Sequence, residues 1–168
     1  MRSVVSLVCV FGVTMGVRAR AGEADWPQFR GPGGQATSGE TGLPLTWSAD
    51  QNIVWKTALP GYGASSPITV GERIFVACYS GYGTSKESPG GPKNLLQHLV
   101  CINRGSGKIE WDKSVPGKPS GEYGGYIALH GYASGTPASD GKAVYAFFGS
   151  TGVFAFDFTG KQLWAASA

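Results

Sequence analysis

The chain has 168 residues, a length typical of one domain. Glycine accounts for 27 of them, roughly 16% against a usual level of about 7%, and the glycines separate short aromatic and β-branched runs. The formal net charge of +3 comes from the first 21 residues, which contain Arg2, Arg18 and Arg20 and no acid. The remaining charges balance without a basic run, so the composition excludes an electrostatic surface for nucleic acid or anionic lipid.

Residues 1–21 have the pattern of a secretory signal peptide. A short positive start is followed by an apolar run at residues 4–17 and by Ala19-Arg20-Ala21, a small-x-small cleavage site. The apolar run is too short to span a bilayer as a mature helix. We therefore expect an exported protein, periplasmic or extracellular, with no membrane span after the signal peptide is removed.

The next segment, residues 22–50, is predicted to be an irregular leader. Its WPQFRGPGG stretch contains too many prolines and glycines to continue a strand or a helix. Trp26 and Phe29 allow two interpretations: a tether that packs both aromatics on the outside of the following domain, or a docking peptide for a protein partner. Packing is favoured because exposed large aromatic side chains are costly.

Residues 51–168 contain a repeat that predicts an all-β fold. Residues 71–77 match residues 141–147, residues 99–111 match residues 153–164, and Ser65-Ser66-Pro67 matches Gly135-Thr136-Pro137. Each copy holds short apolar runs between glycine turns and lacks a helical period. Repeats of roughly 40–50 residues with four strands each are typical of β-propeller blades. We expect a partial propeller, with blade one at about residues 65–115 and blade two at about residues 132–166.

Blade two is the clearer copy. Its four predicted strands are residues 132–136, closed by Pro137, residues 143–148, residues 153–158, and a strand that begins at Gln162. Residues 149–152, Gly-Ser-Thr-Gly, are expected to form a two-residue hairpin loop with a glycine at each corner.

A third, partial copy precedes blade one. Residues 53–61, IVWKTALPG, parallel residues 109–117, IEWDKSVPG, around Trp55 and Trp111. This predicts a fourth strand without its first three, of the kind that completes the last blade of a closed ring and removes its free edge. We therefore expect the N-terminal piece of a longer propeller, whose missing blades belong to the same chain, and self-association of this piece alone.

Export permits a disulfide between the two cysteines that follow the signal peptide, Cys78 and Cys101. If the loop at residues 149–152 sets the register of both copies, Cys101 faces Val76 and Cys78 lies diagonally from it. Diagonal neighbours are roughly 7–8 Å apart, longer than a disulfide usually allows. Two small, buried thiols are therefore favoured, and the redox state stays open.

Two connecting segments are candidate contact surfaces. Residues 80–93 form a flexible polar loop, either an interaction surface or a tolerated insertion. Residues 116–129 join the two blades, and Tyr123, Tyr126 and the following His130 either line a pocket or pack on the neighbouring blade. His98 lies inside a predicted strand, where we expect a packed side chain rather than a ligand.

The turn-plus-tryptophan units carry a family resemblance. Residues 101–111, CINRGSGKIEW, and residues 155–164, AFDFTGKQLW, resemble the A-x-D-x-x-T-G-K-x-x-W repeat of pyrroloquinoline-quinone (PQQ)-like β-propellers. The second copy is one residue shorter, and the first has Cys, Asn and Ser in place of Ala, Asp and Thr. The segments WPQFRGPGG, LPLTWS and NIVWKTALPG look like the exported, non-enzymatic branch of this quinoprotein alcohol dehydrogenase-like superfamily, that of the outer-membrane assembly propeller lipoprotein.

The resemblance implies two function hypotheses. In the first, the chain is a non-catalytic binding or protein-interaction scaffold, in which Trp111 and Trp164 close each blade onto the next. In the second, it is the N-terminal part of a PQQ-dependent alcohol or sugar dehydrogenase, whose cofactor lies on the ring axis with calcium. The candidate acids form no cluster in the sequence: Glu72, Glu87, Glu110, Asp112, Asp140 and Asp157. We therefore assign no catalytic, cofactor-binding or metal-binding residue and favour the scaffold.

Overall fold

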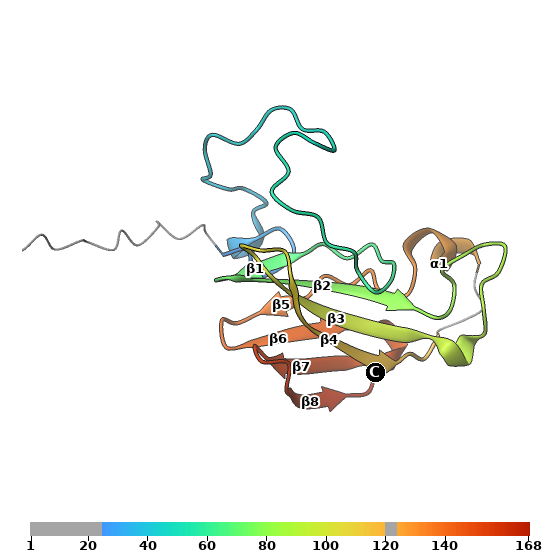
Figure 1. Ribbon diagram of the computed structural model, residues 1–168. Coiled ribbons are helices and arrows are strands. Elements are labelled where there is room, and N and C mark those ends of the chain that lie inside the picture. The colour runs from blue at the N-terminus through green and yellow to red at the C-terminus, as the bar shows by residue number, and fades with distance from the viewer. Residues whose placement is uncertain (1–24, 120–123) are drawn as a thin grey trace, which may run out of the picture.

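The computed structural model describes residues 25–119 and 124–168, whose arrangement is shown in Figure 1. The predicted signal peptide, the first three leader residues and Tyr123 lie outside this part. The described chain forms two four-stranded antiparallel sheets, each with its strands in sequence order, and contains very little helix. The all-β class is confirmed. Within these residues, no helix is long and apolar enough to cross a membrane.

Sheet one consists of β1 (Ile68–Val70), β2 (Arg73–Ser80), β3 (Leu96–Asn103) and β4 (Ile109–Pro116). Phe75 of β2 pairs with Ile68 of β1 and with Cys101 of β3, and Cys101 pairs with Trp111 of β4. The ladder between β3 and β4 shifts by a bulge directly after Cys101.

Sheet two repeats this arrangement in register. It consists of β5 (Ala138–Ser139), β6 (Ala143–Phe147), β7 (Val153–Asp157) and β8 (Gln162–Ala166). Tyr145 of β6 pairs with Ala155 of β7, which pairs with Trp164 of β8, and the ladder again shifts directly afterwards. The equivalent positions are Phe75 and Tyr145, Cys101 and Ala155, and Trp111 and Trp164.

Two predicted details of sheet two are wrong. Residues 132–136 contain no strand, and β5 instead follows the buried Pro137, which has no N–H to donate to a ladder. The loop between β6 and β7 spans residues 148–152, because it contains a 3₁₀ turn, η3 (Gly149–Thr151). Gly149 and Gly152 adopt positive φ angles of 56° and 124°, which favour glycine at both places.

Three other short helical segments lie in the connections: η1 (Pro32–Gly34), η2 (Pro92–Asn94) and α1 (Gly125–His130). The residue pattern does not predict α1. It ends at Gly131, whose φ of 67° stops the helix and whose N–H donates back to Ile127 O.

One apolar core lies between the two sheets. Phe75 and Leu99 of sheet one pack with Val144 and Phe156 of sheet two, and all four are at most 3% exposed. Burial of each such side chain contributes about 1.5–3 kcal/mol. A smaller cluster covers the opposite face of sheet one: Val76, Cys78, Val100 and Ile102, with Trp55 packed against it.

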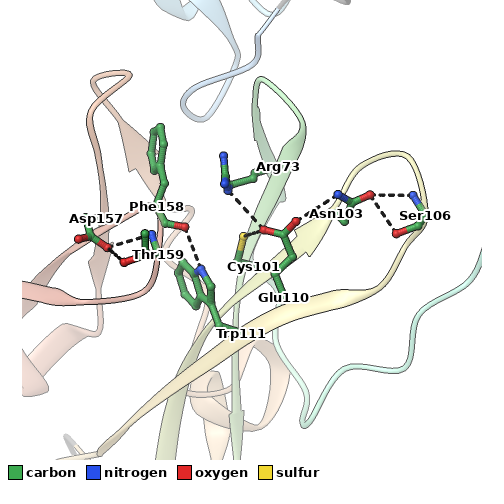
Figure 2. A network of polar contacts seen from close by, with 9 residues as sticks. All are labelled: Arg73, Cys101, Asn103, Ser106, Glu110, Trp111, Asp157, Phe158 and Thr159. Carbon is green, nitrogen blue, oxygen red and sulfur yellow. Dashed lines mark hydrogen bonds and ion pairs between the residues drawn. The ribbon is translucent and has the colours of Figure 1, made fainter.

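A tryptophan on a glycine turn joins the sheets. Trp111 lies against Gly160, where an added Cβ atom would stand 3.0 Å from the ring atom Cδ2, and its Nε1 donates a 3.1 Å hydrogen bond to Phe158 O (Figure 2). Trp55 makes the same contact one sheet earlier, with its ring against Gly107 and a 2.9 Å bond from Nε1 to Arg104 O. Only glycine leaves room for the ring at such a turn.

The segment around Trp55 is not the predicted strand. Residues 53–59 have no strand pairing, and Val54 is 90% exposed. A strand needs a neighbour for its backbone hydrogen bonds, and none of the described strands pairs with this segment. Trp55 nevertheless packs on sheet one as Trp111 packs on sheet two, in agreement with their predicted equivalence.

The leader contacts the first strand of both sheets. Trp26 forms an antiparallel bridge with Thr69 of β1, with N–O distances of 2.9 and 3.0 Å, and Pro27 O accepts a 2.8 Å bond from Ser139 N of β5. Trp26 is partly buried, but Phe29 is 63% exposed. The tether interpretation therefore holds for Trp26 and is wrong for Phe29.

We expect Trp111→Ala to lower the free energy of unfolding by about 3 kcal/mol or more, because the ring that joins the sheets is replaced by a cavity. Trp164→Ala removes the same side chain from the equivalent position, but this side chain is 47% exposed, so the loss should be clearly smaller. Urea unfolding followed by circular dichroism measures both. Equal losses would contradict the role given to Trp111.

Candidate functional site

Three neighbouring strands of sheet one bring a serine, a histidine and an aspartate into contact. Ser80 Oγ lies 2.9 Å from His98 Nε2, and His98 Nδ1 lies 2.9 Å from Asp112 Oδ1 and 3.1 Å from Oδ2. His98 is 5% exposed, whereas Ser80 and the Asp112 side chain are partly exposed. Hydroxyl, imidazole and carboxylate thus form one continuous chain of polar contacts, called here the Ser80–His98–Asp112 cluster.

The strand register produces this cluster. Ser80 of β2 pairs with Leu96 of β3, and Asp112 of β4 pairs with Val100 of β3. Their pairing partners lie two residues from His98 along β3, Leu96 before it and Val100 after it. Alternate residues of a strand share a face, and diagonal neighbours on one face lie within reach of a long side chain.

The burial of His98 agrees with the packed histidine that was expected, but its two partners, Ser80 and Asp112, were not predicted. The predicted register placed Cys101 opposite Val76, whereas Cys101 pairs with Phe75. A slip of one residue moves every side chain to the other face of a strand. In the predicted register, Ser80 and His98 lie on opposite faces of the sheet. A contact between them could therefore not be predicted from the residue types.

The same register separates the two cysteines. Cys101 belongs to the core between the sheets, and Cys78 lies on the opposite face of sheet one, where it pairs with His98. The predicted diagonal arrangement is therefore wrong, but both cysteines are free and buried, as favoured. Burial, with a smaller contribution from nearby carboxylates, raises the pKa of Cys78 to about 11 and that of Cys101 to about 12.

A second polar cluster lies where the turns of the two sheets meet (Figure 2). Glu110 forms an ion pair with Arg73, with 3.4 Å between Oε2 and Nε, and accepts a 3.1 Å hydrogen bond from Asn103 Nδ2. Asn103 Oδ1 accepts a 3.0 Å bond from Ser106 N, and the Arg73 guanidinium lies 5.7 Å from the centre of the Phe158 ring. The first three contacts lie within sheet one, and the Arg73–Phe158 contact reaches the turn of sheet two, so the cluster has a structural role.

Two pockets lie near α1. One, of about 200 Å³, is lined by His130 at the end of α1 and by Tyr62. The other, of about 290 Å³, includes Lys118 and Tyr132 in its lining. His130 therefore lines a pocket, one of its two predicted roles, whereas the side chain of Tyr126 lies outside the described part of the chain.

The loop between β2 and β3 is more ordered than its composition predicted. Tyr82 is 6% exposed and stacks on Tyr132, with ring centres 5.5 Å apart. The Tyr79 hydroxyl donates a 2.9 Å hydrogen bond to Gly83 O. The start of this loop thus belongs to the core, and the exposed polar residues that follow, such as Lys86, stay a candidate contact surface.

The outward face of sheet two has an aromatic pair at the positions equivalent to those of the inter-sheet face of sheet one. Tyr145 and Trp164 have ring centres 6.0 Å apart and planes at 36°, and the equivalent Phe75 and Trp111 are 5.7 Å apart at 44°. Phe147 on the same face is 53% exposed, and Trp164 is 47% exposed. Aromatic groups that are covered in sheet one are thus open to solvent in sheet two.

Asp140 holds Tyr145 in this face. Its carboxylate accepts hydrogen bonds from the backbone N–H groups of Ala143, at 2.8 Å, and Lys142, at 2.9 Å, and from the Tyr145 hydroxyl at 2.9 Å. These bonds favour the charged form and lower the pKa of Asp140 to about 2.

The chain matches no family model and no curated protein. Within residues 25–119 and 124–168, no three or more His, Cys, Asp and Glu side chains are grouped so that they could hold a metal ion. The chemistry that the described site offers is therefore that of the hydroxyl, imidazole and carboxylate of the Ser80–His98–Asp112 cluster.

We expect Cys78 and Cys101 to resist iodoacetamide in the native protein at about pH 8, because burial excludes the reagent and the raised pKa values leave little thiolate. Both should be alkylated in concentrated urea without a reducing agent. Mass spectrometry of the peptides counts the adducts. Alkylation that requires prior reduction would reveal a disulfide and contradict the free thiols.

We expect Asp140→Asn to change how stability depends on pH. The folded pKa of about 2 lies below the ordinary 3.8, so the charged carboxylate adds stability above about pH 4 and loses it as the pH falls towards 2. Unfolding midpoints of wild type and variant should therefore converge over this range. Asp50→Asn, at an exposed aspartate of the loop before sheet one, is the control. A constant difference between wild type and Asp140→Asn would contradict the stabilising role of the carboxylate.

Proposed function

We propose that the chain is part of an exported PQQ-like β-propeller that works as a binding scaffold for a protein partner. One observation carries the proposal. A tryptophan packs on a glycine turn at Trp55 and at Trp111, whereas Trp164, at the equivalent position of sheet two, is exposed to solvent. Repeat proteins form a continuous core by stacking units that cannot bury their own faces.

The open face has the chemistry of a protein interface. Tyr145, Phe147 and Trp164 form an aromatic patch, and buried aromatic side chains dominate the energy of protein interfaces. The contact between the two sheets indicates which partner surface would bind this patch, namely an apolar sheet face beside a glycine turn. The carbonyl of that turn would accept a hydrogen bond from Trp164 Nε1, as Phe158 O accepts one from Trp111.

A quinone cofactor has no place in this proposal. Calcium needs several convergent oxygen ligands, and the described residues contain no group of three or more His, Cys, Asp and Glu that could supply them. Most of the candidate acids already have partners. Glu110 pairs with Arg73, Asp112 contacts His98, and Asp140 and Asp157 accept hydrogen bonds from their own turns. The scaffold therefore assigns none of the described residues to a calcium-bound quinone.

Sedimentation velocity of the full chain tests the scaffold. We expect concentration-dependent association through the open face, and Trp164→Glu should abolish it by placing a charge in an apolar contact. Trp47→Glu is the matched control, because Trp47 is 68% exposed but lies in the loop before sheet one. Association that survives Trp164→Glu, or a wild-type chain that stays monomeric, would count against this face as a binding surface.

Titration with PQQ and calcium separates the two function hypotheses. The scaffold predicts no saturable binding, measured by calorimetry or by quenching of tryptophan fluorescence. Saturable binding that requires calcium would overturn the scaffold in favour of the quinoprotein dehydrogenase.

A further inference from the structure

We propose that Ser80 is a nucleophile, activated by His98 and Asp112, that accepts acyl groups from carboxylic esters. The 2.9 Å contacts from Ser80 Oγ to His98 Nε2 and from His98 Nδ1 to Asp112 Oδ1 join the three groups in that order. A base within hydrogen-bond reach of the hydroxyl, itself oriented by a third group, is the arrangement that activates a serine. This inference is independent of the scaffold, which uses the outward face of sheet two.

Asp112 selects the tautomer of His98. A carboxylate only accepts hydrogen bonds, so the contacts of both its oxygens with Nδ1, at 2.9 and 3.1 Å, place the hydrogen on that nitrogen. The neutral imidazole then has its lone pair on Nε2, where the Ser80 hydroxyl donates to it. The hydroxyl proton therefore already points at a base, which is what general-base catalysis requires.

The surroundings hold the imidazole in place. His98 stands between Cys78 and Ser114 in the ladders of sheet one and is 5% exposed. The thiol of Cys78 stays protonated at neutral pH because burial raises its pKa to about 11, so it does not compete as a nucleophile. A base on a central strand with a locked side chain is well placed for repeated proton transfer.

Ser80 lies where a substrate can reach it. It is the last residue of β2 and is partly exposed, so its hydroxyl lies at the end of the sheet rather than at its centre. Gly81 follows with a φ of +79° and turns the chain out of the strand. Gly61 lies alongside, where an added Cβ atom would stand 3.3 Å from Ser80 Cβ. An added Cβ atom at Gly61 would also stand 2.0 Å from Tyr79 O, so the backbone here has room for glycine alone.

The reaction proceeds in two steps. Ser80 Oγ attacks the ester carbonyl carbon while its proton moves to His98 Nε2, and that proton passes to the departing alcohol or phenol oxygen. The product is an acyl ester on Ser80. Water then attacks this ester, His98 relays a proton from water to Ser80 Oγ, and the carboxylic acid leaves. Asp112 stays ionised throughout and stabilises the imidazolium.

A fluorophosphonate probe and p-nitrophenyl acetate test the site in the full chain. We expect one adduct, placed on Ser80 by mass spectrometry, and measurable ester hydrolysis. Ser80→Ala should abolish the adduct, because it removes the nucleophile. His98→Ala should lower both rates by about a hundredfold or more, the usual size of a general-base effect. Ser114→Ala is the matched control, because Ser114 pairs with His98 in the ladder but lies outside the cluster, and it should leave both rates unchanged.

Asp112→Asn tests the tautomer. The amide can donate to Nδ1, which moves the imidazole hydrogen to Nε2 and removes the base from Ser80, so both rates should fall while the fold remains. Circular dichroism and the urea midpoint check the fold of every variant. Trp164→Glu should be labelled as fast as wild type, so that failure of the scaffold and failure of this site are told apart.

A purely structural cluster gives a different result. It would leave wild-type Ser80 without an adduct, and its variants would differ only in the free energy of unfolding. That outcome overturns the proposal, as does equal labelling of wild type and Ser80→Ala. Mapping of the wild-type adduct needs no variant, so a His98→Ala chain that fails to fold does not hide the answer.

Discussion

The rest of the structure depends on the contact between a tryptophan and a glycine turn. Trp111 projects from the last strand of sheet one onto the turn of sheet two at Gly160, and its indole N–H is satisfied by Phe158 O. The centre of its ring lies 5.7 Å from that of Phe75 and 6.3 Å from that of Phe156, and both phenylalanines are buried in the core between the sheets. The small Cys101, fully buried in the ladder opposite Trp111, leaves room for the ring, as Ala155 does for Trp164.

Because this contact is repeated, the two outer faces of the pair of sheets differ. Trp55 packs on one face of sheet one, and Trp111 projects from its other face onto sheet two. Trp164 projects from the outer face of sheet two. Trp55 packs against the outer face of sheet one, whereas the outer face of sheet two presents Phe147 and Trp164 to solvent.

The polar chemistry of sheet one follows from register alone. Ser80, His98 and Asp112 lie on three successive strands and meet because each ladder offsets them by two residues. The same register places Cys78 and Cys101 on opposite faces. A register shift of one residue moves every side chain of a strand to the other face. The predicted loop was too short and shifted the register in this way, so the predicted cysteine geometry was wrong and the partners of His98 were not found.

Local sequence signals and tertiary packing contributed different parts of this protein. The glycine turns, the β-branched and aromatic runs and the repeated Gly-Lys-x-x-Trp units were enough to predict an all-β chain, the positions of most strands and the equivalence of Trp55, Trp111 and Trp164, because these are properties of short segments. The strand that follows Pro137, the helix α1 and the loop at residues 148–152 depended on backbone geometry that composition does not specify. The Ser80–His98–Asp112 cluster was decided only by the pairing of β2, β3 and β4, since residues 18 and 14 positions apart meet only when the register is set. Register is a cooperative property of a whole sheet, formed as its buried face packs, and no single segment contains it.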